Sequence, residues 1–305
     1  MNFPQLHLLI TGATGLLGRP LLRACALQRG WRVTGTAFRR SGPGLERIDL
    51  SQTEGIPAFL DRLGPDVIVH AAAERHPDVS EKDPVGTQRL NVGASAALAQ
   101  WAAARRAFLI YISTDYVFDG STPPYRPGDL PHPINAYGQS KLDGERAVQA
   151  AGGDHAILRV PILYGDVTTL GESSVTVLAK NMLEAPAGAR LTMEDWATRY
   201  PTHTNDVAAV LRQMVAHKLA HREFGGICHW SGNEPMTKYG MSLAFAPLIG
   251  FDPARLVPDA RPPQGAPRPK DAHLDASALE RLGIGQRTPF AAALPAILAP
   301  HLPRP

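Results

Sequence analysis

The first half of the chain alternates short apolar runs with longer amphipathic or alanine-rich stretches. Apolar runs of about four to eight residues between turn signals are typical of strands buried on both faces, and longer stretches are typical of helices. We therefore expect strands at 6–11, 32–38, 66–73, 108–113 and 155–160, and helices at 15–29, 56–63, 85–106 and 135–151.

This alternation predicts the fold class. Strands joined by right-handed helical crossovers form a parallel sheet. We expect an α/β fold with a Rossmann-type, doubly wound parallel sheet and a smaller α/β substrate lobe. Because ligands of open α/β sheets bind outside the carboxyl ends of the strands, we place the lobe at that edge.

The pattern changes after residue 165. Residues 166–200 look irregular, 204–219 predict a helix with Asn205 or Asp206 near its N-cap, and 225–232 predict a strand. Short helices and a proline-rich loop at 257–270 follow, and there is no internal repeat. We expect a nucleotide-binding domain at 1–165, to which 203–232 returns, and a smaller lobe made of 166–202 and 233–305.

Composition narrows the function classes. The chain has 305 residues, 44% of them hydrophobic and 19% charged, and a net charge of +3. No basic stripe favours nucleic acid, and no apolar run could span a membrane. The apolar start is too short for a signal peptide, so we expect a cytoplasmic protein. Cys25 and Cys228 are interpreted as reduced core thiols, and His203 and His229 as core or pocket residues, so no metal site is expected.

Three glycines follow the first predicted strand and open the first predicted helix: Gly12, Gly15 and Gly18. Glycines at such a turn permit the tight bend, the approach of backbone N–H groups to a pyrophosphate and close packing of helix on sheet. The spacing is GxxGxxG, so the motif is weak by itself, but its position between strand and helix favours a dinucleotide site.

The end of the second predicted strand indicates which dinucleotide. An NAD site usually has an acidic residue there to hold the ribose 2′-hydroxyl. This chain has Arg39 and Arg40, which would instead attract the 2′-phosphate of NADP(H). Asp49 and Leu50 could flank the adenine, and Arg75 with the preceding HAAA segment could line the middle of the cofactor.

A candidate catalytic set follows. Tyr137 and Lys141 are four residues apart and would share one helix face, while Thr114 ends the strand before them. We expect the Lys141 ammonium to lower the pKa of the Tyr137 phenol, so that Tyr137 protonates a carbonyl oxygen that Thr114 orients, and Lys141 also to bind the cofactor ribose. Asp115 would shape the substrate side and Asp119 a turn; neither is expected to be a general acid.

Together these residues resemble the extended short-chain dehydrogenase/reductase superfamily over nearly the whole chain. The segments STDYVFDG, YGQSKLDGE and RPKDAHLDAS are similar to its dTDP-4-dehydrorhamnose reductase branch. The segments AAAERHPDV, RVPILYG, WSGNEPMTKY and LGIGQRTPF resemble the regulatory beta subunits of methionine adenosyltransferase within that branch.

The resemblance implies Thr114, Tyr137 and Lys141 as the catalytic trio. The expected cofactor-binding set is Gly12, Thr14, Gly15, Leu16, Leu17, Gly18, Phe38, Arg39, Arg40, Asp49, Leu50, Ala71, Ala72, Ala73, Arg75, Asn91, Tyr137, Lys141, Pro161 and Leu163.

Three functions remain open at this point. The complete trio favours an NADP(H)-dependent reductase of a carbonyl on a nucleotide sugar or a related small polar substrate. The alternative is an NADP-binding regulatory subunit whose partner is a methionine adenosyltransferase catalytic subunit; an epimerase or dehydratase is a third option, and a homodimer is possible in each case. The chain ends in AAALPAILAPHLPRP, whereas the regulatory subunits it resembles have a longer, aromatic and basic ending that takes part in binding the catalytic partner.

Overall fold

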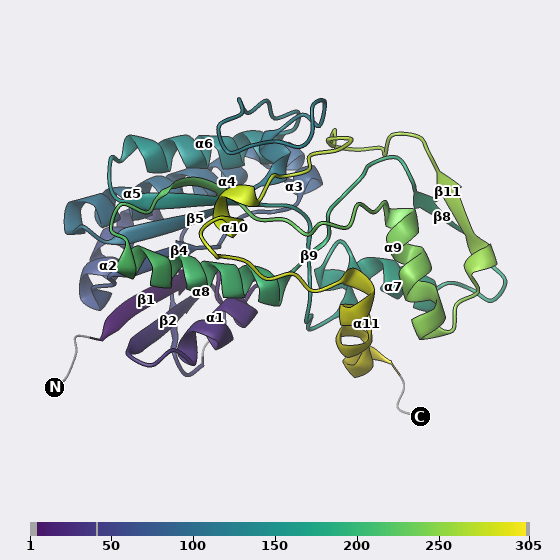
Figure 1. The fold of residues 1–305 in the computed structure, drawn as a ribbon, viewed down its shortest axis with the longest axis horizontal. Coiled ribbons are helices and arrows are strands. Elements are labelled where there is room, and N and C mark those ends of the chain that lie inside the picture. The colour runs from purple at the N-terminus through teal and green to yellow at the C-terminus, as the bar shows by residue number, and fades with distance from the viewer. Residues whose placement is uncertain (1–4, 41, 303–305) are drawn as a thin grey trace.

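The centre of the protein is a seven-stranded sheet in which every pairing is parallel, in the order β10-β6-β5-β4-β1-β2-β3 (Figure 1). This arrangement comes from a computed structural model that describes residues 5–40 and 42–302. Its strands are β1 (Leu6–Thr11), β2 (Trp31–Ala37), β3 (Leu45–Arg47), β4 (Val67–His70), β5 (Phe108–Thr114), β6 (His155–Val160) and β10 (Gly226–His229). The predicted doubly wound α/β fold is confirmed.

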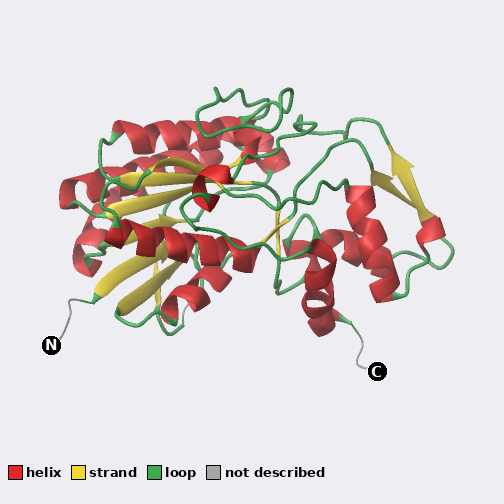
Figure 2. Ribbon diagram, viewed as in Figure 1, coloured by secondary structure: helices red, strands yellow, loops and turns green. Residues whose placement is uncertain are grey.

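Helices cover both faces of this sheet (Figure 2). On one face lie α1 (Gly18–Ala26) and α8 (Thr204–Ala220); on the other lie α2 (Ile56–Leu63), α5 (Ala94–Arg105) and α6 (Ala136–Ala150). The short helices α3 (Pro77–Lys82) and α4 (Pro84–Gln88) precede α5. The expected helix at 85–106 is therefore interrupted, because residues Arg89–Gly93 form one π-helical segment.

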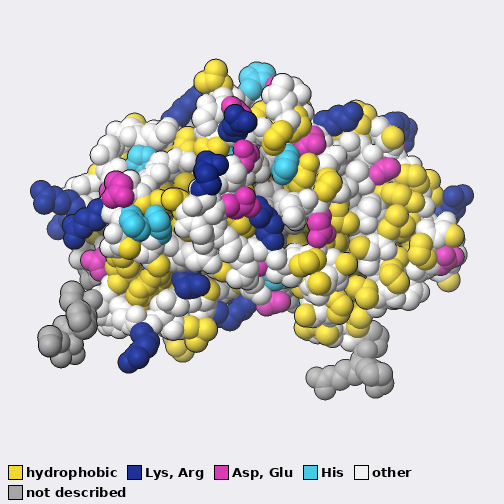
Figure 3. All heavy atoms as spheres, viewed as in Figure 1, with side chains coloured by type: hydrophobic (Ala, Val, Ile, Leu, Met, Phe, Trp, Pro, Cys, Tyr) yellow, Lys and Arg dark blue, Asp and Glu magenta, His cyan; other side chains and the backbone are white. Residues whose placement is uncertain are grey.

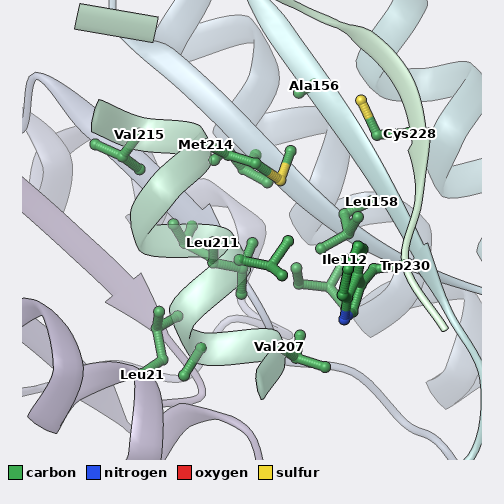
Figure 4. Close-up of a cluster of buried hydrophobic side chains, with 14 of the residues drawn as sticks. Leu21, Ile112, Ala156, Leu158, Val207, Leu211, Met214, Val215, Cys228 and Trp230 are labelled. Atoms are coloured by element: carbon green, nitrogen blue, oxygen red, sulfur yellow. The ribbon is translucent and has the colours of Figure 1, made fainter. Parts of the chain in front are cut away.

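The strands supply both hydrophobic cores because successive side chains of a strand point to opposite faces. Leu8 and Ile10 of β1 join the core beneath α1 and α8, and Leu9 joins the core beneath α2 and α5. Figure 4 shows the first of these cores, where side chains of α8 meet Ile112, Leu158 and Trp230. The continuous apolar runs of the sequence thus reflect burial on two sides.

A smaller lobe adjoins the carboxyl edge of the sheet (Figure 1). It contains α7 (Thr176–Leu183), β8 (Leu191–Glu194), α9 (Lys238–Phe245), β11 (Leu256–Asp259) and α11 (Phe290–Leu298). The strands β8 and β11 pair in parallel, as do β7 (Leu163–Tyr164) and β9 (Thr202–His203), and the short helix α10 (Ser277–Glu280) leads back toward α11. The helices α7, α9 and α11 and the strands β8 and β11 share one buried cluster, separate from the cores of the sheet, whereas Leu279 of α10 packs into the core beneath α1 and α8.

One sequence prediction about this half is corrected, and two regions are defined more closely. Residues 166–200 are not irregular, because Val175, Leu178, Ala179 and Met182 follow helical spacing and bury α7 against the lobe. The C-terminal AAALPAILAP is mostly helix α11, and residues 303–305 of that ending lie outside the described residues. The predicted helix at 204–219 is α8, and Asn205 and Asp206 lie in its first turn, near the N-cap as predicted; the cap itself is His203, whose Nδ1 accepts from the backbone N–H of Asn205.

The sequence also led to expectations about the two cysteines, membrane-spanning helices and metal sites. Cys25 and Cys228 are buried, unbridged thiols, and burial raises the pKa of Cys25 to about 12. Among residues 5–40 and 42–302, no helix is long and apolar enough to cross a bilayer, and no group of three or more His, Cys, Asp and Glu side chains is placed to hold a metal ion.

Candidate cofactor and substrate cleft

A cleft of about 650 Å³ runs along the carboxyl ends of the central strands and beneath the smaller lobe. It begins where β1 and β4 are neighbours, the point at which the strand order reverses and ligands of this fold class bind. Most expected site residues line it: Gly12, Thr14, Gly15, Leu16, Leu17, Gly18, Phe38, Asp49, Leu50, Ala71, Ala72, Ala73, Arg75, Thr114, Tyr137, Lys141, Pro161 and Leu163. Arg39, Arg40 and Asn91 do not.

The glycine turn forms one end of the cleft and could not be built from other residues. Gly12 has a φ of +66°, and a Cβ on it would lie 2.9 Å from the backbone of Ala72. A Cβ on Gly18 would lie 2.1 Å from the carbonyl oxygen of Gly12. No side chain caps α1, which begins at this turn, so the positive end of the helix dipole faces the cleft at the glycines. The turn therefore fits the pyrophosphate of a dinucleotide.

Arg39 and Arg40 lie beside this turn, just after β2, with exposed side chains. A guanidinium nitrogen of Arg40 lies 3.4 Å from the carbonyl oxygen of Thr14, and Arg39 stacks on the ring of Phe38, which lines the cleft. Asp49, the acidic residue that we expected beside the adenine, accepts hydrogen bonds from the backbone N–H and the hydroxyl of Ser51. The charge at this corner is thus positive, as the sequence predicts.

A buried polar network that the sequence analysis missed supports the wall of the cleft. The hydroxyl of Thr11 accepts the backbone N–H groups of Ala71 and Ala72 and lies 2.7 Å from Nδ1 of His70. Nε2 of His70 lies 3.1 Å from the hydroxyl of Ser95. Burial lowers the pKa of His70 to about 3, so it is a neutral structural group. In the sequence, the members Thr11 and His70 of this network are each the polar residue that ends an apolar run.

Asn91 belongs to this support as well. We expected it to contact the cofactor, but its side chain is fully buried in the π-helical segment. Its amide accepts from the backbone N–H of Glu74 and donates to the carbonyl oxygen of Glu74 and to the hydroxyl of Ser140. The prediction of direct contact is therefore corrected: Asn91 fixes the backbone that carries Arg75 toward the cleft.

The predicted catalytic trio meets in the middle of the cleft. Thr114 ends β5, and Tyr137 lies in the first turn of α6, whose N-cap Asn135 accepts from the backbone N–H of Gly138. A Cβ on Gly138 would lie 2.1 Å from the carbonyl oxygen of Tyr116. This close approach holds α6 against the end of β5 and brings Tyr137 next to Thr114.

The charge states differ from our expectation. Burial raises the pKa of Tyr137, and a hydrogen bond with Thr114 only partly offsets this effect. Burial also lowers the pKa of Lys141 to about 7, and its Nζ lies 4.0 Å from the centroid of the Tyr111 ring. The prediction that Lys141 lowers the pKa of Tyr137 is wrong for this geometry, because burial favours the neutral form of both groups.

The two aspartates after β5 have different surroundings. Burial raises the pKa of Asp115 to about 7, and its Oδ1 accepts a hydrogen bond of 3.1 Å from Thr114. Asp119 accepts from the backbone and hydroxyl of Ser121 and from the hydroxyl of Tyr125, which confirms it as a turn residue. Asp115 lines the cleft and Asp119 does not.

Beneath the trio, α6 is tied to β6 by a buried ion pair. Arg159 donates two hydrogen bonds to Glu145, of 2.9 and 2.6 Å, and both side chains are almost fully buried. Ser113 donates to the same carboxylate. His229 lies against Arg159 and His203 caps α8, so neither is arranged as a ligand.

The far end of the cleft was not predicted. Arg199, Lys238 and Arg268 line it from three separate segments of the smaller lobe, opposite Tyr116. Lys238 and Arg268 lie within the segments WSGNEPMTKY and RPKDAHLDAS, but nothing in their spacing along the chain shows that they meet Arg199, and only the fold brings the three together.

Comparisons with known proteins agree with this architecture. Residues 6–302 match the family described as RmlD substrate binding domain. The chain is 48% identical over 303 residues to methionine adenosyltransferase 2 subunit beta of Mus musculus, covering 99% of this chain and 90% of that protein.

Two solved structures have the same fold. A dTDP-4-dehydrorhamnose reductase from Clostridium acetobutylicum is 25% identical, with a TM-score of 0.84, and covers 96% of this chain and 99% of its own. A dTDP-4-dehydrorhamnose reductase from Bacillus anthracis in complex with NADP is 23% identical, with a TM-score of 0.80, covering 98% and 100%. The chain thus belongs to the RmlD substrate-binding domain family of extended short-chain dehydrogenases/reductases.

Proposed function

We propose that this chain is an NADP(H)-binding regulatory subunit of a methionine adenosyltransferase. The observation that carries the proposal is its 48% identity, over almost its entire length, to methionine adenosyltransferase 2 subunit beta of Mus musculus. The identity to the two reductase structures is about half as high. This difference favours the regulatory function over the reductase that the catalytic trio alone suggests.

The cleft supports NADP(H) as the cofactor. The glycine turn fits a pyrophosphate, and Arg39 and Arg40 bring two exposed guanidinium groups to the corner where a 2′-phosphate would lie. Guanidinium groups bind phosphate oxygens through charge-assisted, often bidentate hydrogen bonds. Tyr137 and Lys141, further along the cleft, would contact the ribose and nicotinamide half.

The surface of the smaller lobe is compatible with a protein partner. In the space-filling view, apolar side chains gather over the part of the lobe where α9 and α11 lie (Figure 3). Leu183 of α7, Leu243 of α9 and Leu248 after it are each more than one-third exposed. Contiguous exposed apolar surface often marks a protein interaction site.

The proposal predicts a stable complex. Mixed with the methionine adenosyltransferase catalytic chain of the same organism at micromolar concentration, this chain should elute with it from a size-exclusion column, ahead of either protein alone. Separate elution of the two proteins would contradict the proposal.

A second candidate function is a reductase that acts on a carbonyl substrate. The observation in its favour is that Thr114, Tyr137 and Lys141 are all present and line one cleft. Because burial keeps the Tyr137 phenol protonated, it could give its proton to a carbonyl oxygen while NADPH delivers hydride to the carbon.

The reductase candidate is tested by NADPH absorbance with a panel of nucleotide 4-keto-sugars and with NADH as the control. If the chain is a reductase, Tyr137→Phe should abolish turnover and leave NADPH binding nearly unchanged. No oxidation of NADPH with any member of the panel would leave the regulatory function as the better account.

A further inference from the structure

A short segment of the smaller lobe lies against α1, the helix that begins at the glycine turn. This strap, residues 166–173, follows β7 and contains a 3₁₀ turn at Leu170–Glu172. Leu170 is buried in the hydrophobic cluster of the lobe, and the hydroxyl of Ser173 donates to the carbonyl oxygen of Leu163 in β7. The strap is therefore anchored in the lobe.

A bidentate ion pair joins the strap to α1. Arg19 of α1 donates hydrogen bonds of 2.7 and 2.9 Å to the two carboxylate oxygens of Glu172, and one of 3.0 Å to the backbone carbonyl oxygen of Asp166. The side chains of Arg19 and Glu172, which we call the clasp, are only 18% and 19% exposed. Bidentate pairs of this kind are among the stronger polar contacts in proteins, and partial burial reduces their screening by salt.

Glu172 is held in its charged form. Partial burial raises the pKa of its carboxyl group, but hydrogen bonds from Arg19 and from the backbone and hydroxyl of Thr168 outweigh burial, so this pKa lies below its usual value. The clasp is therefore an ionic contact at neutral pH.

The clasp connects both walls of the cleft at the end where the glycine turn lies. On one side, Arg19 also donates a 2.9 Å hydrogen bond to the carbonyl oxygen of Thr14 in that turn. On the other side, the carbonyl oxygen of Glu172 accepts a 2.7 Å hydrogen bond from Arg75, which follows β4. Thr14 and Arg75 line the cleft, whereas Arg19 and Glu172 do not. A hydrogen-bonded bridge thus runs from the turn after β1, through the strap, to the segment after β4.

We propose that the clasp is a gate that sets the rate at which the dinucleotide enters and leaves the cleft. The pyrophosphate would lie at the glycine turn, between the two walls that the bridge joins. The dinucleotide passes this end of the cleft only when the lobe separates from α1, and that step breaks the clasp. Because Arg19 and Glu172 lie outside the cleft lining, they control exchange without contacting the cofactor. This inference rests on the proposed binding of NADP(H).

The test is stopped-flow measurement of NADPH binding and release, with NADPH fluorescence as the signal and excess NADP⁺ as the chase. Glu172→Gln removes the charge of the clasp with little change of shape. Hydrogen bonds to charged groups are strong, so the release rate should rise at least about tenfold. The association rate should rise as well, because the clasp opens for entry as it does for exit. Since a gate changes both rates by a similar factor, the dissociation constant should change far less than either rate.

The matched control is Asp166→Asn. Asp166 lies in the same strap and pairs with Arg23 of α1 at 3.0 Å, but both of these side chains are 56% exposed. Because exposed pairs contribute little, Asp166→Asn should exchange NADPH at the wild-type rates. If Glu172→Gln fails to fold, Thr168→Ala, which removes a hydroxyl hydrogen bond of 3.1 Å to Glu172, should speed both steps by a smaller factor.

Three results would overturn the proposal: equal rates in the wild type and Glu172→Gln, equally faster exchange in Glu172→Gln and Asp166→Asn, or faster release from Glu172→Gln with an unchanged association rate. The last result would make Glu172 a support for the bound cofactor and not a gate. These three results leave the cofactor proposal intact, whereas no binding of NADPH to the wild type would refute that proposal and this inference with it.

Discussion

At the scale of single residues, burial decides the chemistry of the cleft. Tyr137 and Lys141 are one helical turn apart, and burial favours the neutral form of each, so the pKa of the phenol rises and that of the amine falls to about 7. The sequence identified both residues through their spacing. The direction of the tyrosine shift could not be predicted from it, because burial depends on the lobe and the strands that surround α6.

Lys141 should reduce stability at neutral pH. Its pKa is about 7 in the fold and 10.5 when exposed, so between these values the unfolded chain binds more protons and stability rises with pH. Lys141→Met should therefore be more stable than the wild type in urea at pH 7, and the difference should shrink toward pH 9. Lys180→Met is the control, since that side chain is 45% exposed and keeps its ammonium in contact with water. A Lys141→Met variant less stable than the wild type at pH 7 would refute this interpretation.

At the scale of elements, α6 positions the trio. Tyr137, Lys141 and Glu145 follow one another at four-residue spacing, and Glu145 anchors the helix to β6 through Arg159. The helix is thus fixed at its start by the contact of Gly138 with Tyr116 and in its middle by a buried ion pair.

Breaking the buried ion pair between Arg159 and Glu145 should lower the free energy of unfolding strongly. Arg159→Met leaves the Glu145 carboxylate buried without its cation, which costs about 3–5 kcal/mol in comparable pairs. The control is Arg146→Met, at the residue after Glu145. It removes a surface ion pair with Asp143, and such pairs contribute about 0–1 kcal/mol to stability. Urea unfolding of the two variants measures both losses of stability. Similar losses in the two variants would show that the buried pair does not anchor the helix.

Predictability also differs between elements. The strands and helices of the sheet were predictable because residues such as Leu8–Ile10 and 108–113 form unbroken apolar runs. The helix α7 was missed because glycine, serine and threonine precede it and only one face of two turns is apolar. The π-helical segment at Asn91 was not predictable, since it depends on the hydrogen bonds of Asn91 to Glu74 and Ser140.

At the scale of the whole molecule, the cleft joins two chemically distinct halves. The sheet edge contributes the glycine turn and the predicted catalytic trio, both of which local motifs in the sequence identified. The lobe contributes Arg199, Lys238 and Arg268, which come from segments far apart in the sequence. Asp78 of α3 also holds the loop after β11 by accepting from Ala266 and Arg268, so the two halves close the cleft together.

The same architecture could serve a working reductase or a cofactor-binding regulator. Fold alone does not decide between them, because related folds host many functions. The regulatory function is favoured because the similarity to methionine adenosyltransferase 2 subunit beta extends over almost the entire chain, including the lobe that would contact a partner.

The most direct test of this account is sedimentation velocity of the chain with the methionine adenosyltransferase catalytic chain of its own organism, with NADP⁺ present. The account predicts a single faster-sedimenting complex at micromolar concentration, with no free excess at the matched ratio. Independent sedimentation of the two proteins, together with Tyr137-dependent oxidation of NADPH by a nucleotide 4-keto-sugar, would contradict it.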